Sequence, residues 1–311
     1  VAIFNYLFAR KYRGVFLLRV EDTDLARNLK GSLDRLLEDL RWAGIEWDEG
    51  PDIGGPFVPY VQSQRNDRHM EKALDLEERG LAYRCFCTNA EIEAVRTEGG
   101  NATRCPSGCR TLDPDDVKER ERHESSTGAI RFAVPDGDIE VNDHIRGLIS
   151  FHSKDMGDFI ILRADGRATY NFAVVVDDVD MEITHVIRGA GHLSNTPKQA
   201  LLFDALGSTR PVFAHLPTVL GPDGSRLSKR TGSPGIDRLK AEGFHPDAVV
   251  NYLSLLGWSP GDNREIMSRS EIVRVLDLDR VRPSNTVYDP EKMRWISAQH
   301  IACMTTEELT S

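Results

Sequence analysis

The stretch VFLLRVEDTD, residues 15–24, is the part of the sequence that decides the fold. Its first six residues form an apolar run that only Arg19 interrupts, and such a run predicts a strand that is buried on both faces of a sheet. The acidic residues that follow, Glu21 to Asp24, lie where this strand is expected to end. Strands of this kind are typical of parallel sheets that carry helices on both faces.

Helical patterns flank this strand on both sides. The chain opens inside one amphipathic pattern, and a second follows the acidic residues, where Ser32 can cap a helix and Gly44 can end it. The residues that share the apolar face of this second helix are Leu33, Leu36, Leu37 and Leu40. Helix, buried strand and helix in this order predict an α/β fold with a doubly wound parallel sheet.

The next segments depart from this pattern. A helix is expected from about Asp67 to Gly80, and residues 83–167 then carry cysteines, charged residues and short strand-like pieces. One such piece, residues 158–170, contains Asp165-Gly166, a dipeptide that favours a hairpin turn. We therefore expect an inserted domain with more antiparallel pairing.

Patterns of a parallel sheet return after this insertion. The pieces NFAVVVDD (171–178) and ITHVIRG (183–189) are predicted to be buried strands that end in charge or glycine. Two helices are predicted downstream, over residues 195–207 with Pro197 in the first turn and over residues 245–258.

Composition indicates an ordinary globular protein. The 311 residues carry a formal net charge of -10, which argues against a general nucleic-acid coat but leaves RNA binding through local basic patches open. No apolar run approaches the about 20 residues that span a bilayer, and the first residues lack the features of a signal peptide. We therefore expect a cytoplasmic protein with no membrane contact. Because the chain begins at Val1 inside a helical pattern, we also expect a fragment, or the ordered part of a longer protein.

A basic loop interrupts this acidic chain. The segment GSRLSKRTG, residues 224–232, carries Arg226, Lys229 and Arg230 beside the hydroxyl of Ser228. Small and polar residues interrupt it too often for a helix, which predicts a mobile loop. The loop can be a solvated basic turn, or it can bind a polyanion that arrives and leaves. It lacks the spacing of a Walker A motif, but a lysine on such a loop can neutralise charge that develops on a phosphate.

Polar groups gather where the predicted strands end, which is where ligands bind in open α/β sheets. The three clusters are residues 21–24, 177–178 and 188–189. Arg188 needs a negatively charged partner there, and two kinds are possible. It can form a structural ion pair with one of the acidic clusters, or it can bind a ligand carboxylate through two hydrogen bonds. In the second case Glu21 would receive an ammonium group and Tyr170 would supply a hydroxyl. Such a pocket would suit an amino acid with an acidic side chain.

Four of the five cysteines share one segment with the pattern C-x-C, seventeen residues, C-x3-C. They are Cys85, Cys87, Cys105 and Cys109. Four thiolates can hold Zn²⁺ tetrahedrally and stabilise a small subdomain that lacks a core of its own. The alternative is four unconnected reduced thiols. A catalytic zinc is disfavoured, because four protein ligands leave no open position for water.

Five pieces of the sequence together resemble one family. They are FNYLFAR, LRVEDTD, ATYNFAVVVDDVDMEITHVIRG, HLSNTPKQ and RLSKRTG, and in this combination they resemble the bacterial glutamyl-tRNA synthetases. These are class I enzymes whose second signature, K-M-S-K-S, corresponds to RLSKR in this chain. The resemblance extends in order from Val1 to about Ser311.

The resemblance implies a division into domains. The catalytic domain would be of the Rossmann type and occupy residues 1–63 and 169–217. An inserted α+β acceptor-stem domain would span residues 64–168, with a zinc knuckle over 85–109, and the signature loop and a helical stem-contact domain would span 218–311. The family's first signature would precede Val1 and its anticodon-binding domain would follow Ser311, so we expect neither here.

The resemblance also implies roles for individual residues. Glu21, Tyr170 and Arg188 match the glutamate pocket, in which Arg188 would hold the side-chain carboxylate. The signature residues would serve catalysis through Arg226, Ser228 and Lys229, and ATP binding through Lys229 and Arg230. The four cysteines match the zinc ligands, and Cys105 stands where many members have tyrosine.

The implied reaction is ATP-dependent attachment of L-glutamate to the 3′ end of tRNA(Glu) through a glutamyl-adenylate. It would use ATP, Mg²⁺ and one structural Zn²⁺ per chain, and we expect a monomer. One departure lies beside the ATP site: the family often has RGEDH where this chain has RGAGH, so Ala190 and Gly191 remove two carboxylates.

Other functions stay open. The nearest is the paralogue that attaches glutamate to the queuosine base of tRNA(Asp), but LSKR and the helical segment from His245 onward favour the charging enzyme. A glutaminyl-tRNA synthetase would not need Arg188 for a side-chain amide. A non-catalytic tRNA-binding relative is a further alternative, and a zinc-binding scaffold would leave Glu21, Tyr170 and Lys229 unexplained.

Overall fold

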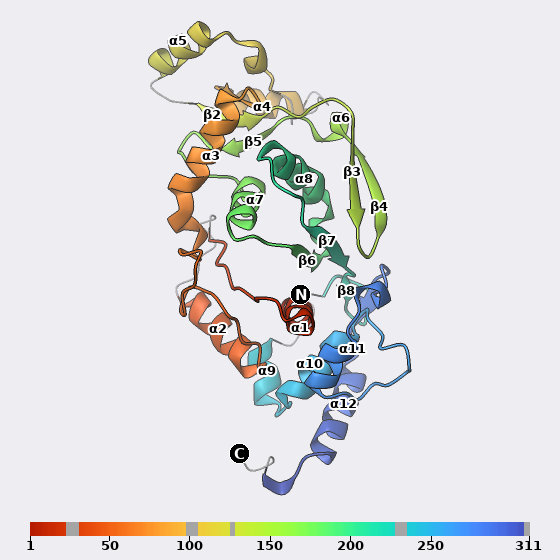
Figure 1. Cartoon of the computed structure of the whole chain (residues 1–311). Coiled ribbons are helices and arrows are strands. Elements are labelled where there is room, and N and C mark those ends of the chain that lie inside the picture. The colour runs from red at the N-terminus through yellow and green to blue at the C-terminus, as the bar shows by residue number, and fades with distance from the viewer. Residues whose placement is uncertain (23–30, 98–104, 125–127, 228–234, 308–311) are drawn as a thin grey trace.

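The structure, a computed structural model, describes residues 1–22, 31–97, 105–124, 128–227 and 235–307 (Figure 1). The helices are α1 (Ala2–Tyr12), α2 (Ser32–Trp42), α3 (Asn66–Glu78), α4 (Asn89–Thr97), α5 (Pro114–Glu124), α6 (Ser153–Met156), α7 (Tyr170–Asp180), α8 (Thr196–Ala205), α9 (Ile236–Ala241), α10 (Pro246–Leu255), α11 (Arg269–Val275) and α12 (Pro290–Ala302). Short 3-10 helices are η2 (Gln62–Arg65), η3 (Cys109–Thr111), η4 (Ala190–Asn195) and η6 (Leu278–Arg280). The strands are β1 (Ala82–Cys85), β2 (Ala129–Phe132), β3 (Asp138–Asp143), β4 (Gly147–His152), β5 (Phe159–Leu162), β6 (His185–Gly189), β7 (Val212–Leu216), β8 (Val219–Leu220) and β9 (Thr286–Val287).

The central sheet has the strand order β4-β3-β7-β6, in which β7 runs parallel to both β3 and β6. Side chains alternate between its two faces along each strand. On β7, Phe213 packs in the core that contains α7 and α8, whereas Ala214 packs in the core that contains Phe4 and Leu7 of α1. Helices therefore cover both faces, and the predicted doubly wound α/β architecture is confirmed.

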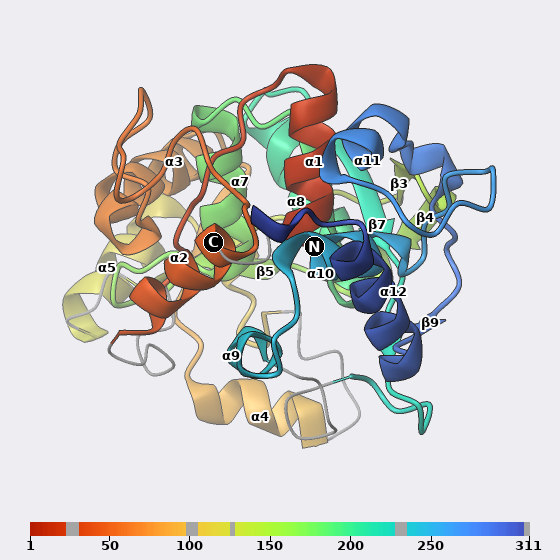
Figure 2. The same ribbon diagram turned by 90° about the horizontal axis from the view of Figure 1, so that it is seen from below.

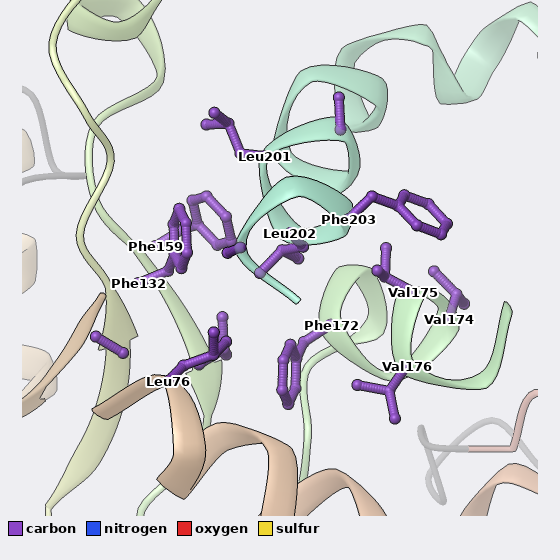
Figure 3. Packing of buried hydrophobic residues seen from close by; sticks show 14 of the residues in the cluster. Leu76, Phe132, Phe159, Phe172, Val174, Val175, Val176, Leu201, Leu202 and Phe203 are labelled. Carbon is purple, nitrogen blue, oxygen red and sulfur yellow. The ribbon is translucent and has the colours of Figure 1, made fainter. Parts of the chain in front are cut away.

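The core on the α7 and α8 side is the larger of the two cores that cover this sheet. Figure 3 shows Phe172 of α7 and Leu202 of α8 converging with Phe132 and Phe159 of the neighbouring sheet. The rings of Phe132 and Phe159 lie 5.3 Å apart between centroids. This packing holds α7 and α8 against the strands.

The predicted strand over residues 171–178 is wrong, because this segment lies within the helix α7. The consecutive residues Val174, Val175 and Val176 are all buried, since α7 packs against α3, α8 and β5 at once. The run from Phe172 to Val176 is both apolar and enclosed, so it shows no amphipathic period. A short apolar run of this kind cannot be told from a buried strand by periodicity.

The predicted strand over residues 15–20 is extended but makes only single bridges. Leu17 pairs with Glu49 and Val20 pairs with Val61, both in parallel. The partners are irregular segments that meet it at one point each, so no regular ladder forms. Val15 is 62% exposed, and the expectation of burial on both faces is therefore wrong.

Helix ends largely follow the sequence signals. The helix α2 begins at Ser32, but its N-cap position is Gly31 rather than Ser32. Gly44 has a φ of 62° and follows the end of α2 as expected, since glycine adopts this left-handed conformation without strain. On the predicted apolar face Leu37 and Leu40 are buried, whereas Leu36 is 49% exposed.

The segment between the two halves of the parallel sheet is largely antiparallel, as predicted. It contains the antiparallel sheet β1-β2-β5, and Gly166 turns the chain back at the end of β5 with a φ of 78°. The hairpin of β3 and β4 leaves this sheet and extends the parallel one, because Asp143 pairs with Phe213. The four domain boundaries stay predictions.

The C-terminal helices lie at the opposite end from this segment (Figure 1). The helices α10 and α11 pack against α1, which Figure 2 shows from below. Met267 and Ile272 share a core with Phe4 and Leu7 of α1. None of the helices in the described part of the chain is long and apolar enough to cross a membrane.

Candidate active site

The candidate site lies at the carboxyl ends of β6 and β7, where α7 and α8 begin. Arg188 is the second-last residue of β6, Tyr170 opens α7 and Thr196 opens α8. The short helix η4, which contains His192, connects β6 to α8. Ligands of open α/β sheets bind at such strand ends, and helix N-termini there favour anions.

Arg188 is held by uncharged groups. Its Nε donates to Nε2 of His215 at 3.1 Å, and its Nη2 donates to Oγ1 of Thr196 at 2.9 Å and to the carbonyl of His192 at 3.4 Å. The guanidinium also lies 5.8 Å from the centroid of the Phe213 ring. Among the described residues, no ion pair of Arg188 with a carboxylate forms, so the structural ion pair considered above is not found there.

The pKa of Arg188 reflects this setting. Burial lowers the pKa, and the more distant charges of Asp178 and Glu21, together with Tyr170, oppose that shift. A partly buried guanidinium without a contacting carboxylate favours a ligand that brings its own negative charge.

The acidic clusters pair with Arg19 instead. Arg19 donates from Nη1 to Asp178 at 2.7 Å and from Nη2 to Glu21 at 3.1 Å. Asp177 and Asp178 lie in α7 and not at a strand end, which corrects their expected position. Because Arg19 holds its carboxylate, Glu21 is oriented in front of the strand ends.

Asp177 anchors α7 to the segment that precedes β1. This fully buried carboxylate accepts hydrogen bonds from Nε of Arg65 at 2.6 Å and from Nε2 of Gln62 at 2.8 Å, and it lies 2.8 Å from Nε2 of His69. Burial alone would raise the pKa of Asp177, but hydrogen bonds from His69 and Gln62 hold it below its ordinary value. These contacts connect η2 and α3 to α7, which carries Tyr170 at its start.

Tyr170 and His192 face each other beside Arg188. The Tyr170 hydroxyl lies 3.4 Å from Nδ1 of His192, and their ring centroids are 6.0 Å apart. Burial raises the pKa of Tyr170, so its hydroxyl keeps its proton and can donate. Burial and the charge of Arg188 lower the pKa of His192, which favours the neutral imidazole.

Behind Arg188 lies a buried pair that the sequence reasoning missed. His215 is fully buried, and its Nδ1 lies 2.5 Å from Oδ2 of Asp143, which is 1% exposed. Burial would raise the pKa of Asp143, but hydrogen bonds from His215 and from the backbone N–H of Arg146 hold the pKa below its ordinary value. The sequence marks neither residue as a partner of Arg188, because strand register brings them together.

The signature loop is only partly described. Ser228, Lys229 and Arg230 lie outside the described residues, whereas Arg226, two residues before Ser228, is described. A side chain added at Gly191 would meet Nη2 of Arg226 at 2.8 Å. The guanidinium of Arg226 therefore occupies the space that a side chain at position 191 would need.

The four predicted cysteines converge on one point, although residues 98–104 between them lie outside the description. Their sulfur atoms all lie within 4.8 Å of one another, with Cys87 to Cys105 at 3.3 Å and Cys87 to Cys109 at 3.9 Å. Tetrahedral zinc with Zn–S bonds of about 2.3 Å requires sulfur atoms about 3.8 Å apart. The backbone N–H of Cys109 also donates to the sulfur of Cys105 at 3.3 Å. The donor set and its spacing therefore fit a structural Zn²⁺.

Comparison with known proteins agrees with this geometry. The family model described as "tRNA synthetases class I (E and Q), catalytic domain" matches residues 1–295. The chain is 48% identical over 304 residues to a glutamate--tRNA ligase of Heliobacterium modesticaldum, covering 96% of this chain and 61% of that protein. It is 46% identical over 304 residues to the glutamate--tRNA ligase of Carboxydothermus hydrogenoformans, covering 96% of this chain and 63% of that protein.

A solved structure is similar over almost the whole chain. It is the glutamate tRNA ligase of Elizabethkingia meningosepticum in complex with its amino acid, with a TM-score of 0.91 and 34% identity over 99% of this chain and 67% of that one. The chain spans about three fifths of the length of the two curated relatives described above. The family model, the curated relatives and the solved structure all agree with the fold and the sequence of this chain. The chain therefore belongs to the class I tRNA synthetase family of the E and Q type.

Proposed function

We propose that this chain carries the catalytic part of a glutamate–tRNA ligase, which attaches L-glutamate to the 3′ end of tRNA(Glu) through a glutamyl-adenylate. The observation that carries the proposal is Arg188, held by neutral groups at the strand ends with no contacting carboxylate among the described residues. An acidic amino acid supplies the charge that this guanidinium lacks. The curated relatives named above act as glutamate–tRNA ligases, which supports the same substrate here.

In this proposal three residues bind glutamate. Arg188 binds the side-chain carboxylate, and the protonated hydroxyl of Tyr170 donates a hydrogen bond to the ligand from the start of α7. Glu21, which Arg19 orients, receives the α-ammonium group. A site built to hydrogen-bond a carboxylate leaves a buried charge unpaired when an uncharged analogue binds, so it discriminates strongly.

The signature loop acts on ATP. Lys229 and Arg230 contact the phosphates, and Arg226 and Ser228 belong to the same catalytic segment. Lys229 stabilises the negative charge that develops on the α-phosphate while the α-carboxylate of glutamate attacks the phosphorus, and Mg²⁺ bound with ATP would add to this electrostatic stabilisation. Pyrophosphate leaves. A ribose hydroxyl at the 3′ end of tRNA then attacks the glutamyl carbonyl of the adenylate, loses its proton and forms the ester, and AMP leaves.

The cysteines have a structural role in this proposal. One Zn²⁺ bound by the four thiolates would hold β1 and η3 together at the tip of the antiparallel segment. That segment, residues 64–168, would contact the acceptor stem, and residues 218–311 would carry the signature loop and a helical stem-contact domain. The protein would act as a cytoplasmic monomer. Residues 1–63 and 169–217 would form the catalytic domain.

A charging assay tests the proposal. The full-length product of this gene is incubated with ATP, Mg²⁺ and radiolabelled glutamate, glutamine or aspartate, and with either tRNA(Glu) or tRNA(Asp). We expect label only from glutamate on tRNA(Glu). The matched control is tRNA(Glu) oxidised with periodate, which lacks the terminal ribose diol and must stay unlabelled. Label on tRNA(Asp), or on the oxidised tRNA, would contradict attachment at the 3′ end of tRNA(Glu).

A further inference from the structure

We infer that His215, held in a single tautomer by Asp143, is a positioning residue for Arg188 and thereby sets the preference of the site for a carboxylate over a carboxamide. The inference rests on the proposed function, which assigns Arg188 to the side-chain carboxylate of glutamate, and it extends that function to the residues behind Arg188.

Strand register places the two residues together. Arg188 of β6 is the register partner of His215 on the parallel strand β7, so both side chains project from the same face of the sheet at neighbouring positions. Asp143 ends β3 and pairs with Phe213 on the other side of β7. Arg188, His215 and Asp143 thus form one hydrogen-bonded row across three parallel strands.

The hydrogen bonds of Asp143 leave one orientation for His215. Its Oδ1 accepts from three backbone N–H groups, those of Ile145 at 3.1 Å, Arg146 at 2.9 Å and His215 at 3.3 Å. Its Oδ2 lies 2.5 Å from Nδ1 of His215, and an ionised carboxylate can only accept. Nδ1 of His215 therefore carries the proton.

The opposite nitrogen of His215 must then be free of a proton. Nε of Arg188 is always a donor, and it points at Nε2 of His215 across 3.1 Å. A neutral imidazole with its proton on Nδ1 presents an acceptor at Nε2, whereas the other tautomer and the imidazolium would present a second donor. Asp143 therefore determines that His215 accepts from Arg188.

This arrangement orients the guanidinium of Arg188 without neutralising its positive charge. Nε donates to His215 and Nη2 donates to Thr196 and His192, all of them uncharged acceptors. Nη1 has no hydrogen-bond partner in the part of the chain that the structure describes. The positive charge stays available to a ligand carboxylate, and a carboxamide cannot neutralise it.

The variant Asp143→Asn separates this role from simple packing. An asparagine keeps its Oδ1 for the three backbone N–H groups, so its Nδ2 must donate toward Nδ1 of His215. The imidazole then changes tautomer, Nε2 gains the proton, and two donors oppose each other at Arg188. The side-chain volume barely changes.

The matched control lies on the same strand. Asp138, at the start of β3, is hydrogen-bonded to His152 in the same way, but both side chains are exposed and far from the site along the strand. Asp138→Asn therefore makes the same chemical change in an aspartate–histidine pair without touching Arg188.

The experiment uses the full-length gene product with ¹⁵N-labelled histidine. Long-range ¹H–¹⁵N spectra report the tautomer of His215, which is assigned by the signal lost in His215→Gln. Steady-state charging reports KM separately for glutamate, ATP and tRNA. For Asp143→Asn we expect the His215 tautomer to switch, KM for glutamate to rise about 10- to 100-fold, and KM for ATP and tRNA to stay within about twofold. Asp138→Asn should match the wild type.

The remaining outcomes contradict either the inference or the proposed function. An unchanged tautomer, or a switched tautomer with unchanged KM for glutamate, overturns the inference. If Asp143→Asn does not fold, the variants His215→Gln and His215→Leu are compared. The side chain at position 215 can still accept a hydrogen bond from Arg188 in His215→Gln but not in His215→Leu, so the KM for the substrate glutamate should be lower in His215→Gln. Equal KM values in the two variants would contradict the positioning role. A wild type that charges no glutamate would reject the proposed function instead, while the spectra still test the tautomer.

Discussion

Arg188 and His215 are register partners on the parallel strands β6 and β7, and Nε of Arg188 donates to Nε2 of His215 across 3.1 Å. The nearby carboxylates do not reach this arginine, because Arg19 binds both Asp178 and Glu21. Two arginines at the same end of the sheet therefore have opposite environments. Arg19 organises the acidic residues, and Arg188 keeps its charge for a ligand.

Replacing Arg188 by alanine should remove the selection for glutamate. A hydrogen bond to a charged group contributes about 1.5–3 kcal/mol, so we expect KM for glutamate to rise at least about 10- to 100-fold while KM for ATP changes little. Charging kinetics measure both values. The control is Arg210→Ala, which removes an arginine that pairs with Asp204 on the surface. Unchanged glutamate affinity in Arg188→Ala would contradict the assignment of the pocket.

Replacing Lys229 by alanine should slow the activation step. A lost contact to transition-state charge typically costs about 10²–10³ in rate, so single-turnover formation of the adenylate should fall by that factor. Lys118→Ala on α5 is the control, since that lysine is exposed and its ion pair in the described part of the chain is with Asp115. A near-normal rate in Lys229→Ala would exclude this lysine from the mechanism.

Removing one thiolate should remove the zinc. We expect one Zn²⁺ per wild-type chain by elemental analysis and much less in Cys85→Ser, because zinc at a four-thiolate site contributes directly to folding. The variant should also lose the protection of amides in β1 and η3 from hydrogen exchange. Cys303→Ser is the control, since Cys303 is exposed and lies outside the cluster. Full zinc content in Cys85→Ser would refute the site.

The buried carboxylate of Asp177 should stabilise the fold in a pH-dependent way. Its pKa is lower in the folded protein than the value of about 3.9 in an unfolded chain, so its contribution is present above about pH 4 and is lost as the pH falls through the folded pKa. Asp177→Asn should lower the free energy of unfolding by about 3–5 kcal/mol at pH 7, because it leaves the buried Arg65 without this partner.

Urea unfolding at pH 7 and at successively lower pH values measures this effect. The difference between wild type and Asp177→Asn should narrow below about pH 4. Asp75→Asn is the control, since the Asp75–Arg79 pair is half exposed and should contribute at most about 1 kcal/mol. A difference for Asp177→Asn that stays constant into acid would rule out the linkage.

The sequence predicted elements well where capping or turn residues mark the ends of an element, even for α8, which is buried along most of its length. The helices α3, α8 and α10 and the strand β6 were all predicted, because their turn residues or apolar patterns bound them. The prediction failed for α7, which packs against α3, α8 and β5 and buries every residue from Phe172 to Asp177, so it shows no amphipathic period. It also failed for residues 15–20, because an apolar run does not reveal whether its neighbours offer a regular ladder.

The candidate site was predictable only in part. Arg188 stands out as a charge at the end of an apolar strand, and the four cysteines stand out by spacing. Asp143 and His215 belong to segments far apart in the chain, and only the register of β3, β6 and β7 brings them behind Arg188. Strand register depends on tertiary packing, so a single sequence does not supply it.

The most direct test of the central claim is ATP–pyrophosphate exchange by the full-length gene product, with glutamate, glutamine or aspartate and with or without bulk tRNA. Of the three amino acids, only glutamate should support exchange, and only when tRNA is present, as the resemblance to the glutamyl-tRNA synthetases implies. Exchange with glutamate in the absence of tRNA, or no exchange under any of these conditions, would contradict that claim.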